Sequence, residues 1–506
     1  MPFAARASLP PFQPVRSAGV SAPASLAAAA LAAALVAAAR SAAFVVWPHA
    51  AFDSDQAIVG LMAKHLAEGR ALPVTFYGQT YMLAVEAYLA APLFAIGGAS
   101  VPLLKLPLLA INAAVAALLV VLLAREARLH PAGALAASGF FTLSTPITSA
   151  YLVAAMGGSV EPFLYVLLIW MTRRRPLLCG AVAGLGFLHR EFSLYGLTAV
   201  IAIAVGREWR EWRALLPRTL ATLAAFATVL ALGNAAIRYG DLFGPEMPRF
   251  ELPAQPSSVA AVAARARCDV VAEVAPNLSW LVSHNLPTLA GTRERGLDEY
   301  YVGRPATAAP LVWTGLAVGL LLAFARSGAV TWRMRTPVPA FLVFLALVGG
   351  QALVAYTGSC GARDPTLIRY TLLALLIPVA VASWHLSVEP IRALRRLTLV
   401  LLLAWMTWSG ARHWAVMAEY LDRAPETPQS RVAAELERRD IRHGRAGYWV
   451  AHYVTFVTGE RVRLASDYPA RILIYDTEVS RAERRANILT GRCPGGVQVG
   501  SLWICE

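Results

Sequence analysis

Two aspartates, Asp53 and Asp55, open the segment FDSDQAIVGLMAKHL shortly after the first long apolar stretch, residues 25–46. Carboxylates beside a membrane-spanning segment are costly unless solvated or paired, so such acids are functional candidates. A carboxylate at a membrane–water boundary can act as a general base toward a hydroxyl or an amine. Asp55 is therefore the candidate catalytic base, and Asp53 is a second acid or substrate-binding residue. Aspartate is also a favoured N-cap residue, and helix capping is the alternative for both.

The segment after Asp55 has the pattern of an amphipathic helix that lies on a membrane surface. Its apolar residues recur at helical spacing and are Ile58, Leu61, Met62 and Leu66. Lys64, His65 and Arg70 lie further along, where they would receive an anionic group. Lys64 is the candidate for binding a donor phosphate. The alternative for Lys64 and Arg70 is that both side chains extend along an interfacial helix to reach water.

Further acids lie near the ends of apolar stretches. Glu191, in GFLHREFSLYG, is a candidate second acid or substrate-binding residue, and Glu161 has similar standing. The alternative is that both residues hydrate turns. No set of histidines and acids in the sequence has the spacing of metal ligands, so dependence on a divalent metal stays open.

Composition defines the class of protein. Of 506 residues, 57% are hydrophobic and 15% are charged, and the mean hydropathy is +0.54. Repeated apolar stretches of about 20 residues have the length that crosses a bilayer. The net charge of +14 does not indicate nucleic-acid binding, because the basic residues fall in short groups between apolar stretches, as in cytoplasmic loops. The sequence has no dinucleotide fingerprint, phosphate-binding loop, HExxH or CxxC motif.

We predict an α-helical polytopic membrane protein with about eleven spans, which places every strong basic group in the cytoplasm. The spans are 25–46, 101–123, 131–149, 160–172, 177–188, 192–205, 215–236, 309–325, 338–356, 369–387 and 397–416. Residues 82–98, which contain Glu86 and Pro92, are predicted to form a helix at the outer interface.

The predicted domains follow from this threading. A cytoplasmic N-terminal tail, 1–24, precedes a transmembrane domain, 25–416, whose large outer loops are 47–100 and 237–308. Residues 417–506 form a small α/β domain on the outer, periplasmic or extracellular, side of an inner (plasma) membrane.

The tail has its own pattern of elements. Gln429–Arg439 reads as an amphipathic helix, and three short apolar runs read as strands: Gly447–Val450, Val462–Ala465 and Arg471–Tyr475. Cys493 and Cys505 flank PGGVQVGSLWI, and we predict a disulfide between them, as an oxidising compartment would allow. A pairing of Cys268 with Cys360 is left open.

The order of a first span, an outer loop opened by an acid pair, an interfacial helix and a YGQ stretch resembles the glycosyltransferase C superfamily. Within it, the chain is similar to the branch of protein O-mannosyltransferases and lipid A aminoarabinose transferases. The resemblance implies transfer of a sugar from a polyprenyl-phosphate carrier to an acceptor on the outer face. The family usually carries Asp-Glu where this chain has Asp55-Gln56, so Gln56 takes the place of the second acid and is a candidate substrate-binding residue.

Further site residues are implied by the same resemblance. The stretch GARDPTLIRYTLLALLIP is similar to the family's Arg-Tyr at the outer start of a late span. By that match Arg369 binds the carrier phosphate, with Arg363 as a second candidate, because a guanidinium suits phosphate oxygens. The residues that would line a lipid or acceptor groove are Tyr77, Gln79, Glu86 and Tyr370. A third match is the tail segment GYWVAHYVTFVTGERV.

The predicted reaction is a single displacement that inverts the anomeric carbon, with Asp55 as the base and Arg369 stabilising the leaving phosphate. The acceptor, whether protein, lipid or glycan, and the sugar are left open. The alternatives are a transporter or flippase of a lipid-linked saccharide and an O-antigen polymerase or ligase. The absence of a repeat between the two halves of the sequence favours the transferase over a transporter.

Overall fold

The computed structural model describes residues 23–79, 81–240, 269–295, 303–305, 309–360, 362–363, 365–467 and 471–506. Most of the predicted tail 1–24, Cys268 and much of the predicted loop 237–308 lie outside these ranges.

Helices make up most of the described chain. The α-helices are α1 (Pro23–Val46), α2 (Ser54–Ala67), α3 (Val85–Gly97), α4 (Val101–Glu126), α5 (Pro131–Ala137), α6 (Gly139–Thr142), α7 (Pro146–Leu152), α8 (Glu161–Thr172), α9 (Pro176–His189), α10 (Leu194–Glu208), α11 (Trp212–Gly240), α13 (Val270–Trp280), α14 (Leu286–Leu289), α15 (Ala309–Met334), α16 (Ala340–Thr357), α17 (Leu376–Val388), α18 (Arg392–Asp422), α19 (Pro428–Arg438), α20 (Tyr448–Val457) and α21 (Leu473–Arg481). Shorter helical turns are η1 (Glu191–Ser193), η2 (Trp209–Glu211), η4 (Leu281–Asn285) and η5 (Pro365–Leu375).

Six helical segments of the described chain are long and apolar enough to cross a membrane, namely Pro23–Val46, Val101–Glu126, Glu191–Arg238, Leu311–Met334, Ala340–Thr357 and Leu367–Val388. Leucines on α11 and α15 are exposed, among them Leu232 and Leu321. Exposed apolar surface of this kind suits contact with lipid. The Glu191–Arg238 segment contains two of the predicted spans, and α8 and α9 are shorter apolar helices. The count of about eleven spans stays a prediction.

One predicted span is not a continuous helix. The stretch 131–149 contains α5, α6 and part of α7, with a break between Leu143 and Thr145. Pro146 opens α7, and proline disfavours helical backbone in the residue before it, which explains the interruption at Thr145. Another predicted span, 397–416, lies within α18, so the predicted domain boundary at 416/417 falls inside a helix.

The predicted surface helix is instead enclosed. In α2, both apolar residues such as Leu61 and polar residues such as Gln56 are buried. The helix packs against α3 on one side and against α20 of the C-terminal domain on another. At Gly60, a Cβ atom would lie 2.5 Å from the Phe456 ring, so glycine permits this close approach. The amphipathic pattern did not reveal that a second domain covers the polar face.

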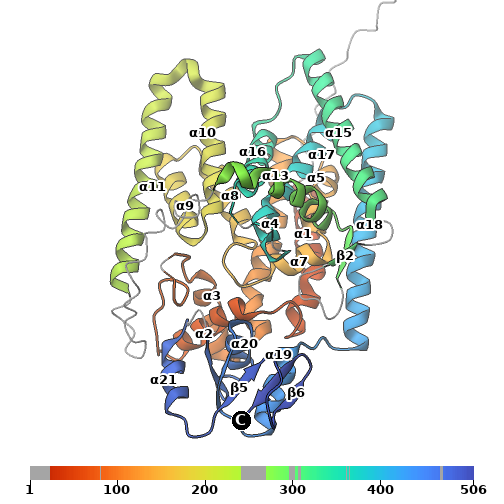
Figure 1. Cartoon of the computed structure of the whole chain (residues 1–506). Coiled ribbons are helices and arrows are strands. Elements are labelled where there is room, and N and C mark those ends of the chain that lie inside the picture. The colour runs from red at the N-terminus through yellow and green to blue at the C-terminus, as the bar shows by residue number, and fades with distance from the viewer. Residues whose placement is uncertain are drawn as a thin grey trace, which may run out of the picture.

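The C-terminal domain is an α/β unit at one end of the helical bundle, beside α2 and α3 (Figure 1). Its strands are β3 (His443–Ala446), β4 (Arg463–Ser466), β5 (Ala486–Leu489), β6 (Val497–Val499) and β7 (Leu502–Cys505). Their order in the sheet is β4-β3-β5-β7-β6, with β3 parallel to β4 and β5, and β7 antiparallel to β5 and β6. A separate antiparallel pair joins β1 (Arg293–Arg295) and β2 (Gly303–Pro305).

The sequence predicted this α/β class correctly but misassigned two of its runs. The helix predicted at Gln429–Arg439 is α19, and the run Val462–Ala465 overlaps strand β4. The runs Gly447–Val450 and Arg471–Tyr475 instead lead into the helices α20 and α21. A run of four or five apolar residues does not distinguish a strand from the first turn of a helix.

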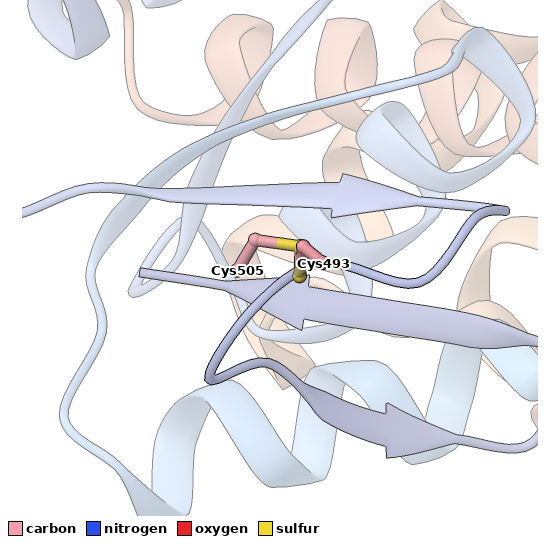
Figure 2. Close-up of a disulfide and its surroundings, with 2 residues drawn as sticks. All are labelled: Cys493 and Cys505. Atoms are coloured by element: carbon pink, nitrogen blue, oxygen red, sulfur yellow. A yellow bond between two sulfur atoms is a disulfide. The ribbon is translucent and has the colours of Figure 1, made fainter.

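Cys493 and Cys505 form a disulfide, the pairing that the sequence predicts. Figure 2 shows it between β7 and the segment that precedes β6. Cys360 is also disulfide-bonded, whereas Cys179 is a free, buried thiol.

Candidate active site

Asp55 lies in the first turn of α2, between side chains from two distant parts of the chain. Its Oδ1 accepts a hydrogen bond of 2.5 Å from the hydroxyl of Tyr448, at the start of α20. Its Oδ2 lies 3.9 Å from Nη1 of Arg369 in η5. The Asp55 side chain keeps 24% of its surface exposed and that of Arg369 keeps 16%. The carboxylate is therefore paired on both sides yet still reachable.

Tyr448 acts as a fixed donor to this carboxylate. Burial raises the pKa of the Tyr448 hydroxyl well above its ordinary value, and the charge of Asp55 raises that pKa further. The hydroxyl therefore stays protonated at neutral pH and keeps donating to Asp55. A hydrogen bond to a charged group orients the carboxylate and stabilises its ionised form.

The Arg369 side chain contacts neighbouring residues, but one of its hydrogen-bond donors has no acceptor among the described residues. Its Nη1 lies 2.8 Å from the Met156 sulfur, and its Cζ lies 5.5 Å from the centre of the Tyr370 ring. Its Nε is buried and has no hydrogen-bond partner among the described residues. Tyr370 in turn meets the ring of Phe192 edge-on at 5.5 Å. Arg369 thus has donor capacity left for an anion.

A second arginine approaches from the C-terminal domain. Nη1 of Arg471 donates to the carbonyl of Gly78 at 2.8 Å, and its Cζ lies 5.8 Å from the Phe76 ring and 5.9 Å from the Tyr448 ring. Its buried Nε also lacks a partner within the described chain. Gly78 has a φ of +68°, and a Cβ there would lie 2.9 Å from Cδ of Arg471. Glycine in the YGQ stretch therefore makes room for this arginine.

The cations of α2 belong to another cluster. The carboxylate of Glu460, whose side chain is 3% exposed, forms ion pairs with Lys64 and with Arg70 (2.8 Å) and accepts a hydrogen bond from Tyr475 (2.8 Å). His65 lies 3.2 Å from the same carboxylate. Burial alone would raise the pKa of Glu460, but its hydrogen bonds with His65, Arg70 and Lys64 hold that pKa well below its ordinary value.

Lys64 belongs to this cluster. Its ammonium pairs with Glu460 and, at 2.8 Å, with Glu68, and its predicted role toward a donor phosphate stays a prediction. The sequence did not show the pairing with Glu460 because Glu460 is 396 residues away from Lys64. The cluster joins α2 to the C-terminal domain.

Asp53 and Gln56 have structural roles next to Asp55. Asp53 is the N-cap of α2, because its Oδ1 accepts a hydrogen bond of 3.0 Å from the Gln56 amide, so the capping alternative holds for Asp53. The buried Gln56 side chain donates to the carbonyl of Ala51 at 3.1 Å and accepts from the amide of Ala155 at 3.3 Å. Gln56 therefore ties α2 to the buried loop of residues 153–160, between α7 and α8.

The other predicted residues are dispersed. The Tyr77 hydroxyl lies 3.0 Å from Nδ1 of His65, and Gln79 is fixed through its backbone in a turn with Phe76. Arg363 is exposed and lies 3.3 Å from Glu273. Glu191 is half-buried in η1, next to α10.

Glu86, predicted to line a lipid or acceptor groove, is buried in the structure. It lies beside His189, whose Nε2 is 3.2 Å away, and near Glu161. Among the described residues, these three form a group that could hold a metal ion. The sequence reasoning missed this group, and it missed Tyr448, Arg471 and Glu460 as well. The only signal for Tyr448 and Glu460 was the segment GYWVAHYVTFVTGERV, which contains both.

Comparisons with known proteins place the fold. The sequence matches no model of a protein family, and no curated protein matches it. A solved structure of ArnT from Cupriavidus metallidurans, bound to undecaprenyl phosphate, is similar with a TM-score of 0.57 at 14% identity, covering 96% of this chain and 98% of that one.

The oligosaccharyltransferase of Archaeoglobus fulgidus is similar at TM-scores of 0.46 in its apo form and 0.47 in complex with Zn and sulfate, with 13% and 11% identity. These matches cover 88% and 90% of this chain but only 65% and 67% of that enzyme, which is thus considerably longer.

The chain therefore shares the fold of this ArnT structure, in a multi-pass arrangement with six helical segments that are long and apolar enough to cross a membrane. The similarity to ArnT extends over nearly the whole length of both chains.

Proposed function

We propose that this protein is a membrane glycosyltransferase that moves a sugar from a polyprenyl-phosphate carrier to an acceptor at the outer face of an inner (plasma) membrane. The observation that carries the proposal is the placement of Asp55 between Tyr448 and Arg369. The fold shared with a transferase solved with undecaprenyl phosphate supports a lipid-phosphate donor.

The chemistry requires a base and a site for the leaving phosphate. The acceptor hydroxyl or amine attacks the anomeric carbon and loses its proton to Asp55, while the bond from that carbon to the phosphate oxygen breaks. The electron pair of that bond stays on the phosphate. A single displacement of this kind inverts the anomeric centre.

Arg369 and Arg471 are suited to receive the phosphate, because each has a buried Nε that lacks a partner within the described chain. When phosphate engages Arg369, the ion pair with Asp55 weakens and Oδ2 becomes available to the acceptor. Cations in a water-poor site stabilise the developing negative charge more strongly than they would in water.

The distribution of arginines supports a cytoplasmic N-terminus and a C-terminal domain outside. A cavity of about 1170 Å³ is lined in part by residues near the turn between α10 and α11, among them Arg207 and Leu215. Figure 1 shows this turn at the end of the bundle away from the C-terminal domain. Arginines line the cavity, namely Arg128, Arg173, Arg174, Arg207, Arg218 and Arg395. Basic residues concentrate at the cytoplasmic side of membrane proteins, so Asp55 faces the opposite side.

The test uses purified protein in lipid bilayers with a panel of radiolabelled polyprenyl-phosphate sugars. We expect wild type to release label from one carrier and Asp55→Asn to lose this release while remaining folded and still binding carrier. Equal release from both would remove Asp55 from the mechanism. Movement of intact carrier across the bilayer without release would identify a flippase instead.

A further inference from the structure

Three ligating side chains converge in a buried site that the proposed reaction does not use. Glu86 comes from α3, Glu161 from the start of α8 and His189 from the end of α9. One ligand atom from each lies within 4.8 Å of the others, and Nε2 of His189 is 3.2 Å from Oε2 of Glu86. All three residues are at most 2% exposed.

Polar atoms in this site lack partners. Oε1 of Glu161 and Nδ1 of His189 are buried and make no hydrogen bond with any described residue. Two carboxylates in contact repel each other, and an unpaired buried polar atom is costly. A divalent cation would cancel both negative charges and use the free Glu161 oxygen.

We propose that Glu86, Glu161 and His189 bind one divalent transition-metal cation. Two carboxylate oxygens and one imidazole nitrogen suit Zn²⁺ or Mn²⁺. Ca²⁺ is a poor match because it takes six to eight oxygen ligands. Three protein ligands leave one coordination position for water or a further ligand.

The site also holds the loop of residues 153–160, every residue of which is buried. Oε1 of Glu86 accepts a hydrogen bond of 2.5 Å from the amide of Gly157, and Oε2 of Glu161 accepts one of 3.1 Å from the amide of Ser159. Arg190, next to His189, donates to the carbonyl of Gly157.

The same loop reaches the proposed active site. Its Ala155 bonds to Gln56, and its Met156 contacts Arg369. A cation bound by Glu86, Glu161 and His189 would therefore position Arg369 through this loop without touching substrate. The cation would have a structural, positioning role. The proposal of a metal site rests on the proposed function only where it predicts an effect on catalysis.

A shared proton is the competing explanation. A proton between the two carboxylates, together with a charged His189, would also reduce the repulsion and leave no room for a metal. The two explanations differ in the metal content of the protein, which does not depend on any donor sugar.

The experiment measures bound metal by mass spectrometry. Wild-type protein is purified in lipid nanodiscs through a tag without histidines, incubated with Zn²⁺, Mn²⁺ or Co²⁺, and desalted. We expect one ion per chain in wild type, with binding at least about 10-fold weaker in Glu161→Gln and His189→Gln. Glu126→Gln is the matched control, because Glu126 pairs with Arg173 elsewhere in the bundle.

Equal metal content in wild type and in both site variants, or none in wild type, would overturn the proposal. If a variant fails to fold, the absorption spectrum of Co²⁺-loaded, desalted wild type decides, because the intense visible bands of four- or five-coordinate Co²⁺ appear only when protein ligands replace water, and their absence rejects the site. Loss of donor turnover in Asp55→Asn has no bearing on these readouts, so the two proposals fail separately.

Discussion

The hydroxyl of Tyr448 lies 2.5 Å from Oδ1 of Asp55, although the two residues are 393 positions apart in the chain. Tyr448 belongs to the C-terminal domain and Asp55 to helix α2 of the helical domain. The C-terminal domain therefore contributes a side chain to the candidate active site.

Replacing Tyr448 by phenylalanine should slow sugar release. Tyr448→Phe keeps the ring but removes the donor to Asp55, and a hydrogen bond to a charged group contributes about 1.5–3 kcal/mol. We expect kcat/KM to fall by roughly 10–100-fold, since each 1.4 kcal/mol corresponds to about tenfold. The neighbouring Trp449→Phe, at an exposed ring, serves as the control. Unchanged kinetics in Tyr448→Phe would assign that hydroxyl a packing role only.

The rate of sugar release should depend on the shape of the cationic group at position 369 as well as on its charge. Arg369→Gln removes a donor to the leaving phosphate, and we expect kcat to fall by roughly 10²–10³-fold. Arg369→Lys keeps the charge but loses the planar fork, so it should recover only part of the rate. Release of labelled sugar measures both, with Arg442→Gln, which is 71% exposed, as the control. Full activity in Arg369→Gln would place the phosphate elsewhere.

The ion pairs of Glu460 should stabilise the folded protein, and this stabilisation should depend on pH. Glu460→Gln leaves Lys64 and Arg70 without their buried partner, and breaking a buried pair in this way costs about 3–5 kcal/mol. The pKa of a free glutamate is about 4.3, and the pKa of folded Glu460 lies below that. The stabilisation is therefore complete above about pH 4.3 and is lost as the pH falls toward the folded-state pKa.

Thermal unfolding of wild type and Glu460→Gln across this pH range measures the effect. We expect the difference in Tm to be large at neutral pH and to shrink as the solution is acidified. Glu426→Gln, at an exposed ion pair, is the control and should unfold like wild type throughout. If the Tm difference stays constant with pH, the stabilisation does not depend on the ionised carboxylate of Glu460, and the prediction is wrong.

The sequence predicted well what depends on local pattern. The predicted threading puts Asp55 and Arg369 on the same side of the membrane, and their side chains lie 3.9 Å apart in the structure. The pairing of Lys64 with Glu460 could not be predicted, because Glu460 lies 396 residues away in the C-terminal domain and no local pattern encodes how that domain packs against α2. The group of Glu86, Glu161 and His189 was missed for the same reason, because three different helices bring it together.

A substitution at Gly78 tests whether Arg471 binds the donor. Comparison with Gly69 separates the effect of backbone strain from the effect of crowding Arg471. Gly78→Ala introduces a Cβ 2.9 Å from Cδ of Arg471, at a φ of +68°. Gly69 has nearly the same conformation, with a φ of +69°, but its Cβ would meet nothing within 4 Å. Each alanine should cost about 1–2 kcal/mol of stability, because left-handed backbone disfavours a side chain.

Only Gly78→Ala should also displace Arg471 from the Tyr448 and Phe76 rings. If Arg471 binds the donor phosphate, this variant should bind the polyprenyl-phosphate sugar more weakly, with a raised KM, whereas Gly69→Ala should keep the wild-type KM. Titration of initial release rates against donor concentration gives both values. A raised KM in both variants would trace the effect to backbone strain, and an unchanged KM in both would remove Arg471 from donor binding.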